Sequence, residues 1–598
     1  MARPAHEDSI YKVSIHKNGG YMYAATHTFT MTDAGKRKYK HVHWGTVTEG
    51  NKFLPGKQYL YATTEERGRL IFPKGWDLSE IDKLASSHKK GRAAHEGEDA
   101  NRLYGDVWLL ERVVDRVGLR KDLETVFDGN AEMVNDILTL AYFPFLTGYN
   151  YTRVARWQRI ERTPSRHELT PTTITRLAQS ITEQNRMDLF RCRAARIGKD
   201  ELCAIDSTTR SAYGHSLADI HWGKNKDHLP LEQTVEVVVY SLDSHMPVYY
   251  RTFPGNIPDS RSVETILADI AHAGFPRVMF VTDRGYESLQ NLERYILRGQ
   301  PMIMSVSVHQ KFIYEKILEF GPIDVRPEAM SLDLKTMLYY KQYDLDYPVK
   351  GNGDVVHKAD RMRLNLFFDA GRRTSDLLCI DAEIERQRLS LAAAMEEGTP
   401  MEDDKTIRRI YNWFDLTLSE TDRKLVSYAV NEKKVFNARK AAGFFAYVTL
   451  GTDKTALESL EAYMLRDEQE KYFQQMKGQM CFGRQQVWTE ESKNGRLFIL
   501  FVAQIISSYV RHVWKDSGHL RKLFGSTHDM LDEMRPIRCI EHTGKMRTIT
   551  PFVGAQVDIC EAFGLDIPEG CAPKYRSRKV EPKRRGRPRK KLTVKLES

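Results

Sequence analysis

Two hydrophobic patterns alternate along the middle of the chain. Short β-branched and aromatic runs predict five strands, at residues 202–205, 234–240, 248–253, 278–282 and 302–308. Apolar residues at helical spacing predict a helix at 262–271, before the fourth strand, and another at 289–297, before the fifth. This order indicates an open α/β sheet, and such sheets carry their functional side chains at the ends of strands.

Asp206 and Asp283 are the side chains that this rule selects, because each ends an apolar run. A strand predicted at 443–449 later leads into a helical segment that contains Glu470. Taken singly, either aspartate is typical of an ordinary turn at a strand end. With Glu470 they form a set of three carboxylates, which is suited to holding two divalent metal ions.

Other stretches differ in pattern and suggest several domains, as the length of 598 residues also does. We expect a β-rich N-terminal domain (1–83), a linker (84–100), a helical domain (101–199), the first part of the α/β core (200–309), an insertion (310–440), the second part of the core with the glutamate helix (441–545), a C-terminal segment (546–572) and a basic tail (573–598). The insertion combines short strand-like runs with an amphipathic helix near 377–395.

No membrane span and no disulfide framework are predicted. The longest apolar stretch, 497–510, has fourteen residues, which is too short to cross a bilayer and indicates a buried helix. The seven cysteines are scattered and form no C-x-x-C pair, so neither a zinc knuckle nor a set of disulfides is supported. Low cysteine density suits a reducing cytosol.

The positive charge of the chain is concentrated at its C-terminus. Residues 573–598 contain twelve Lys/Arg and two Glu, a net charge of +10, which equals the formal excess of the whole chain. A tail of this density favours an acidic polymer as partner. Its centre, Arg585-Gly586-Arg587-Pro588-Arg589, resembles an AT-hook, in which arginines enter a narrow A·T minor groove. A disordered basic tail without sequence preference is the alternative.

The segment around Glu470 has a distinctive spacing. Tyr463, Arg466, Glu470 and Lys477 are separated by three, four and seven residues, which brings all four to one face of a regular helix. A helical face that carries one acid, two cations and a tyrosine is suited to binding a phosphate backbone next to a metal site. Arg466 and Glu470 alone would be an ordinary surface pair, worth about 0.3–0.5 kcal/mol.

These residues resemble the cut-and-paste insertion-sequence transposases of bacteria, which carry a DDE catalytic triad and a Tyr-Arg-Glu-Lys (YREK) signature. The family signature reads Y-x2-R-x3-E-x6-K, and this chain matches each fixed position. The segments 205–208, 281–286 and 443–449 resemble the two aspartate blocks and the strand before the glutamate helix. The resemblance covers roughly residues 200 to 545.

The resemblance implies a multidomain α/β protein whose RNase H-like core is interrupted by a mixed, mainly β insertion domain. It implies catalysis by Asp206, Asp283 and Glu470, which would ligate two Mg²⁺ or Mn²⁺ ions. The expected reaction is cleavage of transposon ends and strand transfer into target DNA. The expected partners are double-stranded DNA, both terminal inverted repeats and target, and a second copy in an end-paired homodimer. The expected location is the cytoplasm, on the nucleoid.

Two other functions remain open from the sequence. One is an RNase H-like nuclease that never joins strands, although the long insertion and the signature lysine favour a transposase. The other is a domesticated DNA-binding protein without catalysis, although binding alone would not require an Asp-Asp-Glu set. Neither a hairpin intermediate nor the sequence of the element ends follows from the chain.

For several other residues the sequence allows either contact with DNA or an ordinary structural role. Tyr463, Arg466 and Lys477 are expected at backbone phosphates. Arg284 is as compatible with a surface ion pair, and Trp413 is a candidate for stacking on a flipped base or an ordinary core tryptophan. The arginines of 153–176 allow a helix-turn-helix or plain helix packing. Ser207, Thr208 and Thr209 are expected to orient Asp206 or to cap a turn, because no histidine motif supports a hydroxyl nucleophile.

Overall fold

The structure is a computed structural model, and it forms two compact units, Met1–Gly97 and Glu98–Ser598. It describes residues 11–18, 21–31, 37–48, 50–56, 58–59, 62, 64–81, 100–212, 217–321, 331–351, 354–359, 361–480, 484–485, 487–541 and 548–571. The predicted linker, apart from residue 100, and the basic tail with its AT-hook-like residues lie outside this range.

The N-terminal unit is built on one antiparallel sheet. Its strands follow the order of the chain: β1 (Ser14–Asn18), β2 (Tyr21–Met31), β3 (Arg37–Thr48) and β4 (Lys52–Pro55). A short helix, α2 (Thr64–Arg69), follows them. One face of the sheet packs on a small core of Val13, Ala24, Val47, Phe53 and Tyr59. Strands β1 and β2 pair antiparallel, with Asn18 opposite Tyr21.

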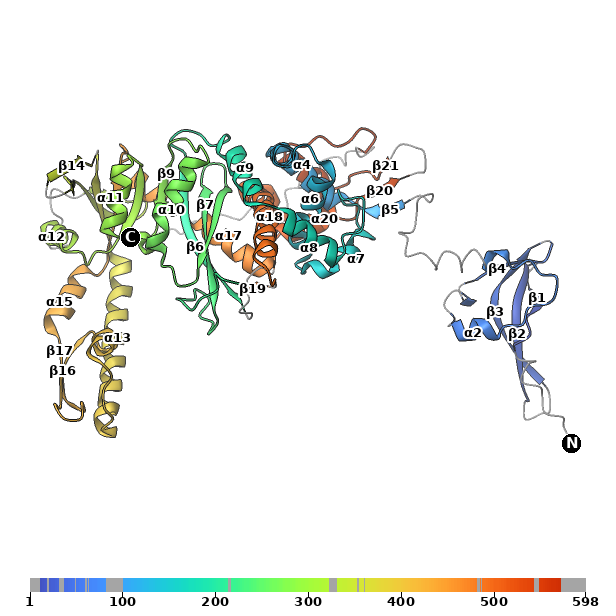
Figure 1. Cartoon of the computed structure of the whole chain (residues 1–598), viewed down its shortest axis with the longest axis horizontal. Helices are drawn as coiled ribbons and strands as arrows, with labels where there is room; N and C mark the ends of the chain where they lie inside the picture. Colours follow the sequence, from blue (N-terminus) through green and yellow to red (C-terminus); the bar gives the residue numbers. More distant parts are fainter. Residues whose placement is uncertain are drawn as a thin grey trace, which may run out of the picture. The chain divides into compact units, whose positions relative to one another are not determined.

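The second unit contains a helical region next to its main sheet (Figure 1). Its elements are β5 (Ala100–Leu103), α4 (Gly105–Arg116), α5 (Leu119–Val126), α6 (Ala131–Thr147), η2 (Tyr151–Arg153), α7 (Val154–Gln158), α8 (Pro171–Ser180), α9 (Glu183–Ala194), α18 (Glu490–Asp516), α19 (Gly518–Leu523), α20 (Thr527–Met534), β20 (Arg538–Glu541), β21 (Thr548–Ile549) and α21 (Ala555–Ala562). The early helices and α18 come from distant parts of the sequence, and α18 packs against α4, α6 and α8.

Helix α18 confirms the buried helix predicted around residues 497–510. It is the one described helix that is long and apolar enough to cross a membrane, but 72% of its most apolar window is buried inside the protein. Its apolar side chains contact other helices and strand β8, so its hydrophobicity is explained by a place in the core.

The main sheet has ten strands, of which nine follow the order β11-β12-β15-β18-β10-β9-β6-β7-β8. Its central part consists of β6 (Leu202–Ala212), β7 (Gln233–Ser241), β8 (Met246–Pro254), α10 (Asp259–His272), β9 (Met279–Thr282), α11 (Leu289–Leu297) and β10 (Met302–Val306). The predicted sequence of strands and helices is therefore confirmed. Strand β6 pairs in parallel with β9, which pairs in parallel with β10. Strand β9 ends at Thr282, opposite Ile205, whereas β6 continues to Ala212, so Asp206 lies within its strand and not at the strand end that the sequence predicts.

The segment 310–440 contributes to two different structures. The elements of the first are α12 (Lys311–Phe320), β11 (Ser331–Asp333), β12 (Leu338–Asp344), β13 (Pro348–Gly351), β14 (Asp354–Lys358) and β15 (Arg363–Asp369). Strands β11, β12 and β15 extend the main sheet beyond β18 (Phe444–Leu450). Part of the segment that the sequence predicts as an insertion therefore contributes strands to the main sheet.

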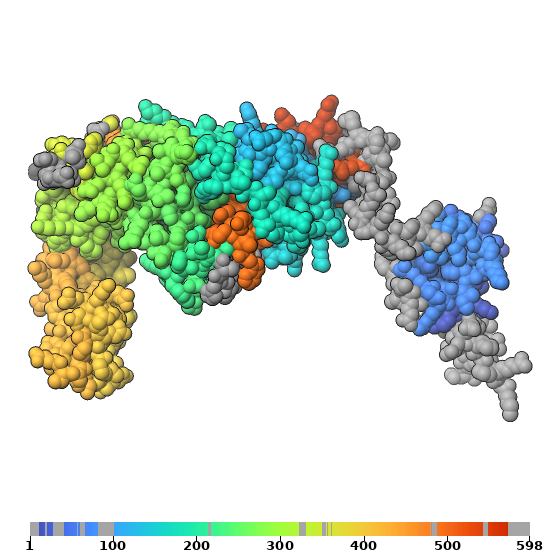
Figure 2. All heavy atoms as spheres, in the orientation of Figure 1, coloured from blue at the N-terminus to red at the C-terminus, as the bar shows by residue number. Residues whose placement is uncertain are grey.

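The second structure is an arm that stands out from the sheet (Figure 2). It consists of α13 (Ala370–Glu397), α14 (Asp404–Ile410), β16 (Phe414–Leu418), β17 (Leu425–Val430) and α15 (Glu432–Ala441). Helix α13 has 28 residues and is the longest element of the segment. Leu391, Phe414 and Leu425 form a small core where this helix meets the hairpin.

Candidate functional site

The first two carboxylates lie side by side on neighbouring strands. The parallel register pairs Ile205 of β6 with Thr282 of β9, so the next residues along the two strands are Asp206 and Asp283. All residues of β9 and nearly all of β6 are buried, although residues 206–211 of β6 are polar or charged. Asp283 accepts a hydrogen bond from Gly285 N at 2.8 Å, which fixes the turn that follows.

Glu470 is connected to Asp206 through the side chain of Arg466, which contacts both carboxylates. One terminal nitrogen of the Arg466 guanidinium lies 3.2 Å from Asp206 Oδ2, and the other lies 2.9 Å from Glu470 Oε1. The Arg466 side chain is only 15% exposed, so this is a partly buried bridge. The geometry thus brings the three carboxylates predicted from the sequence to one region, with a cation between the first and the third.

The helix that carries these residues is not regular, so the expectation of one continuous helical face is wrong. Helix α16 (Ala456–Met464) ends before Arg466, α17 (Asp467–Gln474) carries Glu470, and a π-helical turn, η4 (Gln475–Gln479), carries Lys477. A π turn holds more residues than an α turn, so it changes the direction of the side chains beyond it. Lys477 accordingly contacts another part of the site.

Lys226, in the loop between β6 and β7, lies near the carboxylate oxygen of Asp206 that Arg466 does not contact. Lys226 Nζ donates to the carbonyl and hydroxyl oxygens of Ser207 at 2.8 and 2.7 Å, and it lies 3.7 Å from Asp206 Oδ1. The next residue, Asp227, accepts two bonds from Lys477 Nζ at 2.7 and 2.8 Å. These two adjacent loop residues therefore connect the strand of the first aspartate to the signature lysine.

A fourth carboxylate, Asp259, belongs to the same network. It lies in the first turn of α10, accepts a hydrogen bond from the Ser207 hydroxyl at 2.6 Å and lies 3.4 Å from Lys226 Nζ. Sequence reasoning missed both Asp259 and Lys226. An aspartate at a helix start and a lysine in a polar loop are ordinary in a sequence, so no local signal could have selected them. The prediction that Ser207 orients Asp206 remains untested, although its backbone N–H does donate to Asp206 Oδ1 at 2.7 Å.

Burial and neighbouring charges act on Asp206 in opposite directions. The pKa of Asp206 is raised to about 6, with burial as the largest cause and the nearby Asp283 adding to it, whereas Lys226 and Arg466 act to lower it. Burial lowers the pKa of Arg466, but Tyr463 and the carboxylates raise it above its ordinary value. The two cations therefore stabilise an ionised carboxylate that burial alone would protonate.

The donor set fits hard divalent cations by chemistry, because it consists of carboxylate oxygens. Within the described residues, no three acidic, histidine or cysteine side chains already converge to hold a metal ion. The Arg466 guanidinium lies between Asp206 and Glu470. A metal ion shared by those two carboxylates therefore requires this guanidinium to move.

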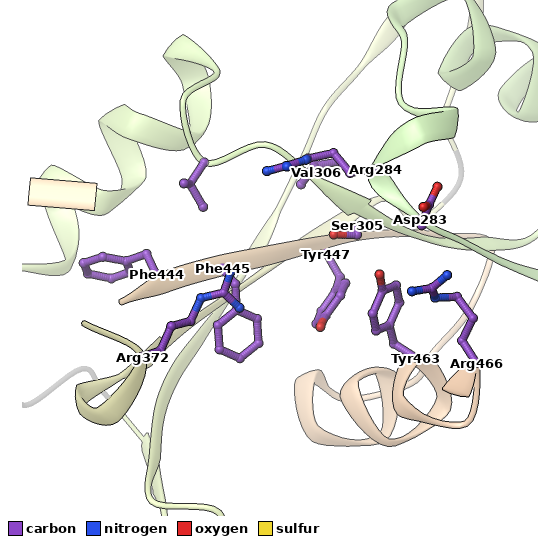
Figure 3. A pocket seen from close by; sticks show the side chains of 11 residues that line it. Asp283, Arg284, Ser305, Val306, Arg372, Phe444, Phe445, Tyr447, Tyr463 and Arg466 are labelled. Atoms are coloured by element: carbon purple, nitrogen blue, oxygen red, sulfur yellow. The ribbon is translucent and has the colours of Figure 1, made fainter. Parts of the chain in front are cut away.

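A cavity of about 300 Å³ opens beside the carboxylates (Figure 3). Its lining combines aromatic rings with arginines: Asp283, Arg284, Ser305, Val306, Val308, Arg372, Phe444, Phe445, Tyr447, Tyr463 and Arg466. The Tyr463 ring lies 4.4 Å from that of Tyr447, and the Arg466 guanidinium lies 5.4 Å from the Tyr463 ring. The predicted residues Tyr463, Arg466 and Arg284 thus share one cavity with Asp283.

Trp413 lies in the arm and is not among the described residues that line this cavity. Its side chain packs against the small core of Leu391, Phe414 and Leu425, and its backbone N–H donates to Gln387 Oε1 at 3.2 Å. Its indole nitrogen is buried without a partner among the described residues. Contact between Trp413 and DNA stays a prediction.

Comparison with known proteins gives a family match over the part of the chain that carries the site. Residues 197–506 match the model of the transposase DDE domain family. No curated protein matches the chain. Among solved structures, the piggyBac transposase synaptic complex with hairpin DNA is 12% identical, with a TM-score of 0.21, over 76% of this chain and 80% of that chain.

A second solved structure is the Mos1 transposase paired-end complex with the left transposon end. It is 14% identical, with a TM-score of 0.13, over 43% of this chain and 76% of that chain. Both TM-scores are too low to support conclusions about the geometry of this protein. The family match therefore rests on the sequence of residues 197–506.

Proposed function

Because this chain belongs to the family of transposases with a DDE domain, we propose that it cuts the ends of a DNA transposon and joins them to target DNA. The observation that carries this proposal is the meeting of Asp206, Asp283 and Glu470 around Arg466. We propose these three residues as the catalytic and metal-ligating set.

The central strand order supports an RNase H-like core. Strands β10-β9-β6-β7-β8 carry two parallel pairs on one side of β6 and two antiparallel pairs on the other. The first aspartate then lies on the middle strand, and the second lies on its parallel neighbour. The matched spacing of Tyr463, Arg466, Glu470 and Lys477 supports the YREK class of bacterial insertion sequences.

Divalent metal is the cofactor that DDE transposase domains generally use, and we propose Mg²⁺ or Mn²⁺ here, as two ions. Bound by the three carboxylates, such ions would supply the positive charge that stabilises in-line displacement at phosphorus. The residues of the chain position the DNA. Arg466 has the planar donors for a bidentate phosphate contact, and Lys477 offers a compact charge.

Partners and location follow from this function. We propose that terminal inverted repeats and target DNA bind as double strands, and that two copies pair two ends as a homodimer on the nucleoid in the cytoplasm. Arg284, Tyr463 and the basic tail are proposed contacts to the DNA backbone, with Arg585, Arg587 and Arg589 as the groove-binding residues of the tail.

The test replaces each carboxylate by its amide, as Asp206→Asn, Asp283→Asn and Glu470→Gln. Strand cleavage in Mg²⁺ should fall at least a hundredfold, since lost metal ligation removes several kcal/mol of transition-state stabilisation. DNA binding and the thermal unfolding midpoint serve as controls for folding. Glu458→Gln, on the exposed first turn of α16, is the matched control and should cleave normally.

An integration assay separates transposase from nuclease. A transposase joins cleaved 3′ ends to a second DNA, and a nuclease leaves only cut products. Wild-type cleavage by any one amide variant would remove that residue from the proposed set, and cleavage without joined products would favour the nuclease.

A further inference from the structure

Asp259 is a largely buried carboxylate outside the proposed set of three. It lies in the first turn of α10, and its side chain is only 19% exposed. Its Oδ1 accepts a hydrogen bond from the Ser207 hydroxyl at 2.6 Å, and its Oδ2 lies 3.4 Å from Lys226 Nζ. A carboxylate with so little exposure costs free energy unless its charge is balanced. Both partners that balance it belong to the surroundings of Asp206.

Asp259 also lies close to the second aspartate. A Cβ atom on Gly285 would lie 3.0 Å from Asp283 Oδ1 and 3.3 Å from Asp259 Oδ2. The two oxygens therefore approach one point, one from α10 and the other from the turn after β9. A side chain at residue 285 would enter the space next to both of them. Asp259 is thus a neighbour of Asp283 as well as of Asp206.

A cation lies between Asp206 and Asp259 in the structure. The Lys226 ammonium is 3.7 Å from Asp206 Oδ1 and 3.4 Å from Asp259 Oδ2. It also donates to the carbonyl and hydroxyl oxygens of Ser207 at 2.8 and 2.7 Å. Hard divalent cations take carboxylate and carbonyl oxygens as ligands. The ammonium therefore occupies a place whose oxygen atoms also suit a divalent ion.

The backbone around Lys226 is anchored, so the fold sets the place of this ammonium. Lys226 N donates to Thr209 Oγ1 at 3.0 Å, and Asn225 Nδ2 donates to Ser211 Oγ at 3.0 Å. Thr209 and Ser211 lie on the same face of β6 as Ser207, because side chains alternate along a strand. Residues 225 and 226 are therefore fixed along the polar half of β6.

A buried hydroxyl without a partner lies near the same carboxylates. Tyr286 ends a 3₁₀ turn, η3 (Arg284–Tyr286), directly after Asp283. Its hydroxyl oxygen is buried and has no hydrogen-bond partner among the described residues. The pKa of Tyr286 is raised well above its ordinary value, mainly by burial and also by the negative charges of Asp259, Asp206 and Asp283. A buried donor that lacks a partner beside three carboxylates fits a site that receives a further ligand.

The charges of this cluster do not balance. It contains four carboxylates, Asp206, Asp259, Asp283 and Glu470. Within the described part of the chain, their ion pairs involve two cations, Lys226 and Arg466. Two negative charges remain, and a divalent ion supplies the positive charge that balances them.

We propose that Asp259 is a fourth carboxylate ligand of the metal centre, and that it shares a divalent ion with Asp206 at the place that the Lys226 ammonium occupies. The proposal rests on the proposed function, because it takes its ion from that centre. Lys226 is then an internal competitor that the ion displaces. The alternative role of Asp259 is to position Ser207 and Lys226 without any contact to an ion.

Titration of the full-length, DNA-free protein with Mn²⁺ in a calorimeter tests this proposal. Asp259→Asn keeps the size of the side chain and an oxygen that can accept from Ser207. It removes the charge, so Mn²⁺ affinity should fall at least about tenfold. Asp269→Asn is the matched control, because Asp269 lies on the same helix, is also 19% exposed, and has Tyr249 and Arg251 as its partners. The control should leave Mn²⁺ affinity unchanged.

Two further variants separate ligation from positioning. Ser207→Ala removes the hydrogen bond to Asp259 and leaves all four carboxylates, so it should reduce Mn²⁺ affinity less than Asp259→Asn does. Lys226→Met removes the competing ammonium, so Mn²⁺ should bind this variant more tightly than wild type. Asp259→Asn added to Lys226→Met should again weaken binding, because the ion itself depends on Asp259. This double variant loses both charges of the pair, so it retains the test if Asp259→Asn alone does not fold.

Three outcomes would overturn the proposal. They are wild-type Mn²⁺ affinity in Asp259→Asn, equal losses in Asp259→Asn and Ser207→Ala, and no effect of Asp259→Asn once Lys226 is replaced. The last two would assign Asp259 to positioning. Thermal unfolding midpoints verify folding. The proposed function fails separately, because Mn²⁺ binding and strand cleavage that depend on Asp206 but not on Asp259 would leave the set of three carboxylates intact.

Discussion

At the scale of single residues, Arg466 has two roles that exclude each other. In the structure it neutralises Asp206 and Glu470, with contacts of 3.2 and 2.9 Å. In the proposed complex with metal and DNA it binds phosphate instead. The same pattern holds for Lys477, which is paired with Asp227. Both signature cations are thus internally neutralised until a ligand replaces their carboxylate partners.

This leads to a prediction for Arg466→Ala. Without the guanidinium, Glu470 loses this ion pair and Asp206 keeps only Lys226 as a cationic neighbour, so Mn²⁺ should bind DNA-free protein about tenfold more tightly, or about 1.4 kcal/mol. Binding to cleavable DNA ends should weaken. Isothermal titration with Mn²⁺ measures the first effect, and gel shift measures the second.

Lys471→Ala is the matched control, because Lys471 lies on the same helix and pairs with Asp467 at 2.6 Å, away from the three carboxylates. It should leave Mn²⁺ affinity unchanged. An Arg466→Ala protein with weaker Mn²⁺ binding would show that the guanidinium holds the carboxylates in place.

At the scale of elements, the packing of α18 decides how the helical region meets the sheet. Gly495 lets this helix approach α8 so closely that a Cβ atom there would lie 1.8 Å from the carbonyl oxygen of Ala178. Backbone atoms on both sides cannot move aside as a flexible side chain does. The contact therefore depends on the absence of a side chain.

Gly495→Ala should consequently lower the free energy of unfolding by about 1–3 kcal/mol or more, in the manner of an overpacked core. Gly518→Ala is the control, because a Cβ atom there meets nothing within 4 Å. Differential scanning calorimetry compares the unfolding midpoints. Equal midpoints for Gly495→Ala and wild type would mean that the two helices can separate without cost.

A second prediction at this scale concerns Asp106 at the start of α4. Burial, together with the nearby Glu161, raises the pKa of Asp106 from its usual value near 4 to about 7. The folded state then binds more protons at Asp106 than the unfolded state between these values, so the contribution of this group to stability is most favourable below pH 4 and falls as the pH rises through 7.

Asp106→Asn imitates the protonated acid and should stabilise the protein at pH 8 by a few kcal/mol. The difference from wild type should shrink steadily as the pH falls toward 4. Denaturant unfolding at several pH values measures it. A difference that is constant with pH would mean that Asp106 does not titrate in this range.

At the scale of the whole molecule, the excess of positive charge lies in a different segment of the sequence from the three carboxylates. The carboxylate site is formed by residues between 206 and 470, whereas twelve Lys/Arg are concentrated in residues 573–598. We expect such a protein to bind DNA of any sequence through its tail. We expect cleavage only where the carboxylate site contacts the DNA strand. The two properties should therefore be separable by truncation.

Deletion of residues 573–598 should lower affinity for every DNA and flatten its dependence on salt. Each lost phosphate contact reduces the slope of log K against log salt by about 0.9. Cleavage at saturating DNA should survive, because the triad lies elsewhere. The stricter variant Arg587→Ala/Arg589→Ala should cost more affinity on A·T-rich than on G·C-rich duplex. An unchanged slope after deletion would show that the tail does not contact DNA.

The sequence by itself determined the features that depend on neighbours along the chain. The strands that lead to Asp206 and Asp283 follow from local β-branched runs, and the order of strands and helices follows from the periods of the pattern. The spacing of Tyr463, Arg466, Glu470 and Lys477 is likewise local, and so is the apolar helix that became α18. The family match also rests on such local patterns.

Tertiary structure alone decided which other groups join the site. Ser207 meets Asp259 across 52 residues of sequence and Lys226 across 19, and neither partner carries a local signal. The π turn moved Lys477 toward Asp227, although a regular helix was the simplest expectation. In each case the deciding contact joins segments far apart in sequence, and periodicity carries information only about neighbours along the chain.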